Sequence, residues 1–80
     1  MLPIILAAAT CIATPEAYEQ LSEKYHESRA LVGLSQSGAI LEIWTGPEGS
    51  WTALLTRPDG ISCVVDSGQG AHVVAQGEPA

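Results

Sequence analysis

The stretch Trp51–Val65, WTALLTRPDGISCVV, decides the fold because it contains a complete β-hairpin. Two runs rich in β-branched and large apolar residues flank a turn, a pattern typical of paired strands. Pro58 stands at the second turn position and Gly60 at the fourth, which suits a type I turn closed by a residue of positive φ. The resulting three-residue loop places Leu55 opposite Cys63.

Two further turns precede this hairpin and extend it into a meander. Ser35–Gly38 (SQSG) and Gly46–Gly49 (GPEG) both end in glycine, and the second has proline at the same turn position as the hairpin. Because consecutive turns of this kind join antiparallel neighbours, residues 31–75 predict short strands that form a sheet of three or four strands. Gly68–Gly70 (GQG) predicts one more turn.

Alternation along the hairpin divides its side chains between the two faces of the sheet. The larger and more apolar set is expected to face a helix, and it comprises Trp51, Ala53, Leu55, Cys63 and Val65. The second set comprises Thr52, Leu54, Thr56, Ser62, Val64 and Asp66. In the preceding strand Glu42 is expected to point outward, which puts Leu41 and Ile43 inward. A bulge near Gly46 reconciles this orientation with the pairing to the next strand.

Residues 14–30 have the pattern of a helix that packs on the sheet. Thr14 is a good N-cap, and Pro15 suits the first helical position. Glu16 follows in the first turn, where the helix dipole favours anions. Gly33 is the expected end of this segment. The sequence therefore predicts an α+β domain, with one N-terminal helix near residues 15–30 packed on an antiparallel meander sheet.

The apolar opening stretch, residues 1–13, stands apart from the domain expected over 14–75 and from a flexible tail at 76–80. Its sequence MLPIILAAATC has the apolar run and Ala-x-Ala signature of a signal peptide, but it lacks a basic start and is short for one. Three interpretations stay open. The stretch is a truncated leader, an added strand of the sheet, or a lipoprotein segment anchored through Cys11.

Cys11 and Cys63 are the two cysteines of the chain, and they lie far apart in the sequence. They are either buried free thiols in a reducing compartment or one disulfide that ties the segment before the helix to a central strand. The position expected for Cys63, on the helix-facing side of the sheet, favours the disulfide. Closing a loop of roughly 50 residues stabilises a domain by about 4 kcal/mol. Two lone cysteines lack the paired spacing that structural zinc sites favour.

Several short motifs resemble those of a group of small exported proteins of Gram-negative bacteria. The motifs are Tyr25–Glu27, Gly33-Leu34, Glu42, GSWT (Gly49–Thr52), TRPDGISCVV (Thr56–Val65) and the turn at Gly68. The resemblance covers most of residues 11–70, although the leaders of that group are longer and more basic. It implies a periplasmic or secreted location and a Cys11–Cys63 disulfide. It implies no activity.

Composition excludes two large classes of function. The formal net charge is −6, and Lys24, Arg29 and Arg57 are the three fixed cations. Because nucleic-acid affinity depends on clustered Lys and Arg, the sequence predicts no nucleic-acid binding. The longest apolar run, Ile4–Ala9, is far shorter than the roughly 20 residues of a spanning helix, so no spanning membrane segment is expected.

No catalytic or cofactor motif stands out, and no cofactor is expected. Ser35 in GLSQSG lacks the strand-to-helix turn of a nucleophile elbow, so we interpret it as part of a polar turn. The spacing of four residues gathers side chains on one helical face, namely Glu19, Glu23, His26 and Glu27. Glu19, Glu23 and His26 are weak metal candidates. We interpret them as a solvated acidic face, because the sequence contains no second cluster to complete a metal shell.

Two hypotheses about function follow. The favoured one is a non-enzymatic accessory or interaction module of the cell envelope, whose partner is another protein or a second copy of the chain. Its expected interface is apolar surface on the second face of the sheet, at Trp44, Leu54 and Val64.

The alternative hypothesis is a small acidic ligand- or metal-binding protein, or an enzyme, that uses the helix. A structural or accessory protein of a bacterial virus is a variant of the first hypothesis. The expected location is periplasmic or secreted, and it becomes cytoplasmic or virion-bound if residues 1–10 are a retained strand.

Overall fold

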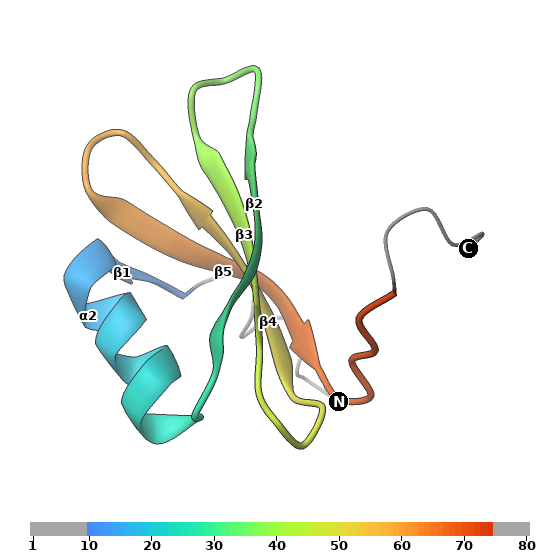
Figure 1. Cartoon of the computed structure of the whole chain (residues 1–80). Coiled ribbons are helices and arrows are strands. Elements are labelled where there is room, and N and C mark those ends of the chain that lie inside the picture. Colours follow the sequence, from blue (N-terminus) through green and yellow to red (C-terminus); the bar gives the residue numbers. More distant parts are fainter. Residues whose placement is uncertain (1–9, 75–80) are drawn as a thin grey trace.

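The computed structural model describes residues 10–74 as a five-stranded antiparallel sheet with a short helix on one face (Figure 1). The strands follow the order β1-β5-β4-β3-β2 across the sheet. Their bounds are β1 Cys11–Ala13, β2 Ser28–Leu34, β3 Ile40–Thr45, β4 Trp51–Thr56 and β5 Ile61–Gly68. The predicted α+β class is confirmed, but the predicted three or four strands are too few. The expectations for residues 1–9 and for a tail at 76–80 lie outside the described residues.

Three hairpins of one kind join β2 to β3, β3 to β4 and β4 to β5. Each loop ends in a glycine of positive φ, namely Gly38 at 93°, Gly49 at 94° and Gly60 at 89°. The loop ends are held by backbone bonds such as that from the Arg57 N–H to the Ile61 carbonyl, 2.8 Å long. Positive φ is unfavourable for any residue with a Cβ, so these turns select glycine. The three predicted hairpin turns are confirmed, as is the pairing of Leu55 with Cys63. The stretch Gly68–Gly70, predicted as a further turn, is a bend at the end of β5.

The helix is shorter than predicted and ends in a wide turn. Its parts are α2, Thr14–Glu19, and η1, Gln20–Lys24, a π-helical turn. The Tyr25 N–H donates to the Gln20 carbonyl, and the Glu27 N–H then donates to the Leu21 carbonyl. His26 between them has a φ of 56°, in the left-handed region. The chain therefore reverses at residues 25–27, and β2 begins where the sequence predicted the last helical turn.

The start of the helix also differs from the prediction. Ala13, rather than Thr14, occupies the N-cap position, and Pro15 lies in the first turn. The Thr14 hydroxyl instead forms a hydrogen bond with the Ser62 hydroxyl of β5, 2.9 Å away. Gly33 does not follow the helix but lies inside β2, because this segment forms its backbone bonds with β3. Tertiary strand pairing thus outweighs the local helix prediction for residues 28–30.

The edge strand β1 is joined to β5 by the disulfide. Cys11 lies directly opposite Cys63, with their Cα atoms 4.0 Å apart, and the two residues form a disulfide. In the next pair of the ladder, the Val64 N–H donates to the Thr10 carbonyl at 2.9 Å. The cysteines therefore occupy a non-hydrogen-bonded pair, where facing Cα atoms of an antiparallel ladder come closest. The predicted disulfide is confirmed, and residues 11–13 of the opening stretch belong to an added strand.

The helix covers the opposite face of the sheet from the one predicted. Glu42 pairs with Leu54 in an unbulged ladder between β3 and β4, so the two side chains share a face. That face lies under the helix, where Glu42 and Leu54 are each 1% exposed. The predictions that Glu42 points outward, that Leu41 and Ile43 point inward and that a bulge lies near Gly46 are therefore wrong. A difference of one residue in register exchanges the two faces of a strand.

The hairpin set expected to face the helix lies on the other face. The cross-strand pairs Leu54–Val64 and Thr56–Ser62 keep the predicted division of side chains, but they lie on the helix side. A β-bulge follows the pair Leu54–Val64 and brings Asp66 opposite Ala53. Asp66 therefore lies on the face of Ala53, not with Leu54 and Val64 as predicted. The strand prediction for the last residues is also too long, because β5 ends at Gly68.

Candidate functional site

The three residues predicted to form an exposed interface belong to the core. Trp44 and Leu54 are buried with Ala17 and Leu21 of the helix, and Val64 packs against this cluster. Leu54 is 1% exposed, so no partner can reach it without displacing the helix. The predicted interface at Trp44, Leu54 and Val64 is therefore wrong in its residues, because it was assigned to the face that the helix covers.

A carboxylate forms the polar centre of this core. Tyr18 donates its hydroxyl proton to Glu42 Oε2 at 2.5 Å, and Trp44 Nε1–H donates to Oε1 at 2.9 Å. The guanidinium of Arg29 lies 3.4 Å from Oε2 and 5.5 Å from the centre of the Tyr18 ring. A bulge in β2 at residue 30 puts Arg29 on this face of the sheet. Two donors and one cation thus compensate the burial of Glu42.

The environment of Tyr18 makes the free energy of unfolding decrease at alkaline pH. Burial raises the pKa of Tyr18 above its ordinary value of 10.0, and the hydrogen bond and charge of Glu42 raise it further, while Thr56 and Arg29 lower it. The unfolded chain therefore loses this proton at lower pH than the folded chain does. The stabilisation is complete below pH 10.0 and is lost as the pH rises from there through the folded-state pKa.

We expect the Tyr18→Phe variant to show a flatter decline of the free energy of unfolding above about pH 10 than the wild type. Urea denaturation at a series of alkaline pH values, followed by tryptophan fluorescence, measures this decline. Tyr25→Phe, which removes an exposed tyrosine hydroxyl, is the matched control and should follow the wild-type profile. Equal slopes for the wild type and Tyr18→Phe would contradict the assignment.

Hydrogen bonds between hydroxyl groups extend the polar network on the helix side of the sheet. Ser62 lies 2.9 Å from the Thr14 hydroxyl and 2.7 Å from the Thr56 hydroxyl. Thr52 Oγ1 donates to Glu27 Oε1 at 2.9 Å. The buried polar residues of this face are Glu27, Glu42, Thr52, Thr56 and Ser62. Within residues 10–74, every fully buried side-chain nitrogen and oxygen atom has a hydrogen-bond partner.

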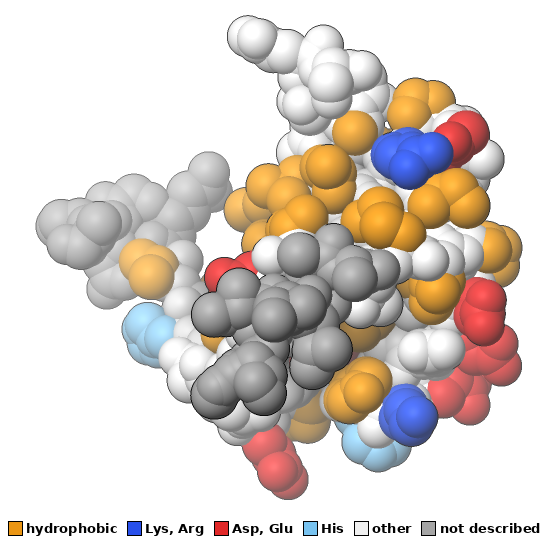
Figure 2. All heavy atoms as spheres, turned by 180° about the vertical axis from the view of Figure 1, so that it is seen from behind, with side chains coloured by type: hydrophobic (Ala, Val, Ile, Leu, Met, Phe, Trp, Pro, Cys, Tyr) orange, Lys and Arg blue, Asp and Glu red, His pale blue; other side chains and the backbone are white. Residues whose placement is uncertain are grey.

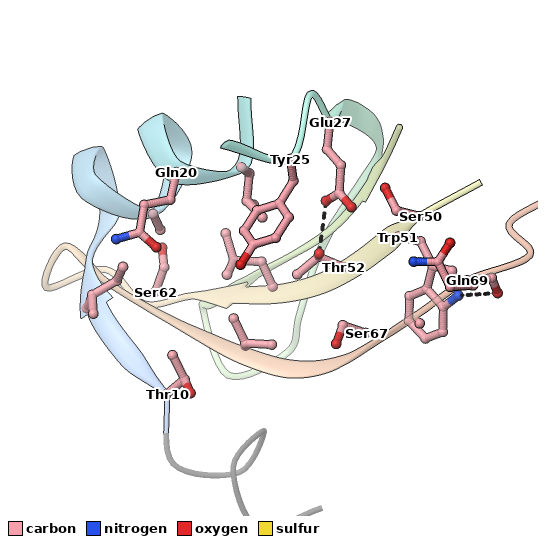
Figure 3. Close-up of a pocket in the computed structure, with 16 residues that line it drawn as sticks. Thr10, Gln20, Tyr25, Glu27, Ser50, Trp51, Thr52, Ser62, Ser67 and Gln69 are labelled. Carbon is pink, nitrogen blue, oxygen red and sulfur yellow. Dashed lines mark hydrogen bonds between the residues drawn. The ribbon is translucent and has the colours of Figure 1, made fainter. Parts of the chain in front are cut away.

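A cleft of about 360 Å³ opens between the helix and the sheet (Figure 3). Gln20, Tyr25 and Glu27 line it from the helix and the turn that follows. Figure 3 shows Tyr25 and Glu27 extending toward the sheet, with Trp51 at one end of the cleft. The Trp51 Nε1–H donates to the Gln69 carbonyl at 3.2 Å, which holds the chain after β5 against that end. Apolar wall residues are Ile12, Ala17, Leu21, Leu54 and Val64.

Sequence reasoning placed Glu27 only among the acidic residues of an exposed helical face, beside the weak metal candidates. The residue was expected inside an exposed helix, whereas the turn at His26 directs it under the helix end, where it is buried. The weak metal candidates lie elsewhere: Glu19 ends α2, Glu23 is in η1, and His26 is in the turn. In the described part of the chain, no three His, Cys, Asp or Glu residues lie close enough together to hold a metal ion.

The face of the sheet away from the helix is apolar. We define the open face by Leu31, Leu41, Ile43, Trp51 and Leu55, which alternation places opposite Glu42 and Leu54. Leu31 is 56% exposed and Leu41 37%, and the other three are half-buried. Figure 2 shows hydrophobic side chains gathered over part of the back of the molecule, with most acidic side chains toward its edge.

Comparisons of the chain with protein-family models, with curated proteins and with solved structures found no match. Among the helices in residues 10–74, none has the length and hydropathy needed to cross a membrane.

Proposed function

We propose that this protein is a non-enzymatic interaction module of the cell envelope, periplasmic or secreted, and that its open face binds a second copy of the chain. The observation that carries the proposal is the placement of the helix. It covers the face with the buried polar network and leaves most of the more apolar face outside. Residues 71–74 border that face at Leu31, Ile43 and Trp51. Contiguous exposed apolar surface of this kind is typical of interaction sites.

Charge favours a second copy as the occupant of the open face. None of its five defining residues is charged, although the chain carries a net charge of −6. Asp66, which pairs with Ala53, is an exposed acid on this side of the sheet. The helix acids Glu16, Glu19 and Glu23 belong to the layer on the other side of the sheet. Two copies packed sheet to sheet therefore keep these acids apart, and the apolar side chains interdigitate as in other aligned sheets.

The size of the open face predicts a reversible dimer. Four strands about 4.8 Å apart and six residues long at about 3.4 Å per residue span roughly 400 Å² in projection. A standard interface buries about 800 Å² of accessible surface per partner. We therefore expect association that depends on protein concentration.

The disulfide supports a location outside the reducing cytoplasm. Cys11 is exposed, and its bond to Cys63 is open to cellular reductants. Structural disulfides persist mainly in the periplasm and in secreted proteins. The resemblance of the sequence to exported bacterial proteins agrees with this location.

We expect Leu41→Glu to convert the dimer into a folded monomer, because it buries an unpaired carboxylate from each copy in the interface. Sedimentation equilibrium over a range of protein concentrations measures the association, and circular dichroism checks the fold. Leu34→Glu is the matched control, because Leu34 is 79% exposed and alternates with Gly33 onto the helix side of the same sheet.

Two outcomes would overturn the proposed dimer. One is a wild-type chain that stays monomeric at about 1 mM, far above the concentration at which interfaces of biological size associate; the occupant of the open face would then be a different protein. The other is equal loss of association in Leu34→Glu and Leu41→Glu, which would place the contact outside the open face.

A further inference from the structure

Glu27 lies in the cleft with one oxygen unused. Its side chain is 4% exposed and lines the cleft beneath the helix end. Figure 3 shows it extending toward Thr52 beside the ring of Tyr25. Thr52 Oγ1 donates to Oε1 at 2.9 Å. Among residues 10–74, no donor is bonded to Oε2, and since every fully buried oxygen there has a partner, Oε2 is accessible from the cleft.

The two buried carboxylates of the molecule differ in how their charge is balanced. Glu42 accepts bonds from Tyr18 and Trp44 and forms an ion pair with Arg29. The ion pairs within the described residues are Arg29–Glu42 and Arg57–Asp59, so Glu27 has no cation beside it. A buried carboxylate without a cation is unfavourable. A cationic ligand bound in the cleft would balance this charge.

The rest of the cleft is suited to a small apolar body. Leu21 lines it on the helix side, and Leu54 and Val64 line it on the sheet side. Its volume of about 360 Å³ is near the lower end of small-molecule sites and holds roughly a dozen groups of water size. The aromatic ring of Tyr25 stands beside Glu27 at the mouth, where it can face a cation.

We infer that this cleft binds a small primary amine, whose ammonium group donates to Glu27 Oε2 while its apolar body packs against Leu21 and Val64. The ammonium supplies both missing elements, a positive charge and a donor for Oε2. The net charge of −6 raises the local concentration of cations around the chain. Glu27 and Thr52 lie on the helix side of the sheet, and Trp51 borders both the cleft and the open face. The test is therefore run at protein concentrations where the chain is monomeric.

Isothermal titration of the full chain with phenethylammonium, and in parallel with phenethyl alcohol, tests the inference. The two probes share an apolar body and differ in the charged group. We expect the amine to bind at least about tenfold more tightly than the alcohol, because a charged hydrogen bond in a partly desolvated site is worth that difference or more. Amide chemical shifts should change at Tyr25, Glu27 and Thr52.

Glu27→Gln is the decisive variant, because its amide oxygen can still accept from Thr52 while the negative charge is lost. We expect it to bind the amine about tenfold more weakly and the alcohol unchanged. Glu48→Gln, in the exposed turn between β3 and β4, is the control and should bind like the wild type. Equal affinity of the wild type for amine and alcohol overturns the inference, and this comparison needs no variant to fold. Equal affinity of wild type and Glu27→Gln for the amine also overturns it.

Discussion

Replacement of both Cys11 and Cys63 by alanine is expected to lower the free energy of unfolding by about 4 kcal/mol. The disulfide joins residues separated by 52 positions, so its loss releases a long loop in the unfolded chain. A domain of this size has a total stability of about 5–15 kcal/mol at most. The variant should therefore be partly unfolded near physiological temperature. Urea denaturation, at concentrations where the wild type is monomeric, measures the difference.

Reduction of the wild type provides the control for this experiment. Dithiothreitol should lower the stability of the wild type to that of the double variant and leave the variant unchanged. A loss of less than about 1 kcal/mol would mean that the reduced unfolded chain already keeps β1 near β5, contrary to the chain-entropy argument.

Glu42→Leu is expected to cost about 3 kcal/mol of stability, although leucine is the more apolar residue. The substitution leaves the Tyr18 hydroxyl and the Trp44 indole N–H without their acceptor. Arg29 also loses its partner, but its side chain is partly exposed and can be solvated, so this contributes less. Thermal and urea unfolding followed by circular dichroism measure the loss.

Two comparisons isolate the role of the Glu42 acceptors. Glu48→Leu, at an exposed turn position, should change stability by less than about 0.5 kcal/mol. Glu42→Gln keeps an acceptor oxygen and should fall between the wild type and Glu42→Leu. A stable Glu42→Leu variant would show that the polar centre can be replaced by simple packing, as happens with some buried ion pairs.

The hairpins and the disulfide could be predicted from the sequence. The hairpins depend on neighbouring residues, and the disulfide depends on only two cysteines. A glycine of positive φ at Gly60 fixes a three-residue loop, and the loop fixes that Leu55 faces Cys63. Two cysteines allow a single intramolecular pairing. The residue at which the helix ends could not be predicted in this way. Residues 28–30 were predicted as the last turn of the helix, but they belong to β2 because β3 pairs with Ser28 and Arg29.

The candidate sites could not be found from the sequence, because both depend on which face of the sheet the helix covers. Alternation separates Leu54 and Val64 from Leu55 and Cys63, and the structure keeps this division. The prediction placed the more apolar set of side chains against the helix on hydrophobicity alone, but the helix covers the other face.

By itself the sequence determined the antiparallel meander, its turns and the disulfide, since turn conformation and strand alternation act between neighbours in the chain. Only the tertiary structure decided that Glu42 and Glu27 are buried and that Leu41 is exposed. The physical reason is that a buried polar group is tolerated when its partners are present. Those partners come from distant segments, Tyr18 for Glu42 and Thr52 for Glu27, and meet only in the folded chain.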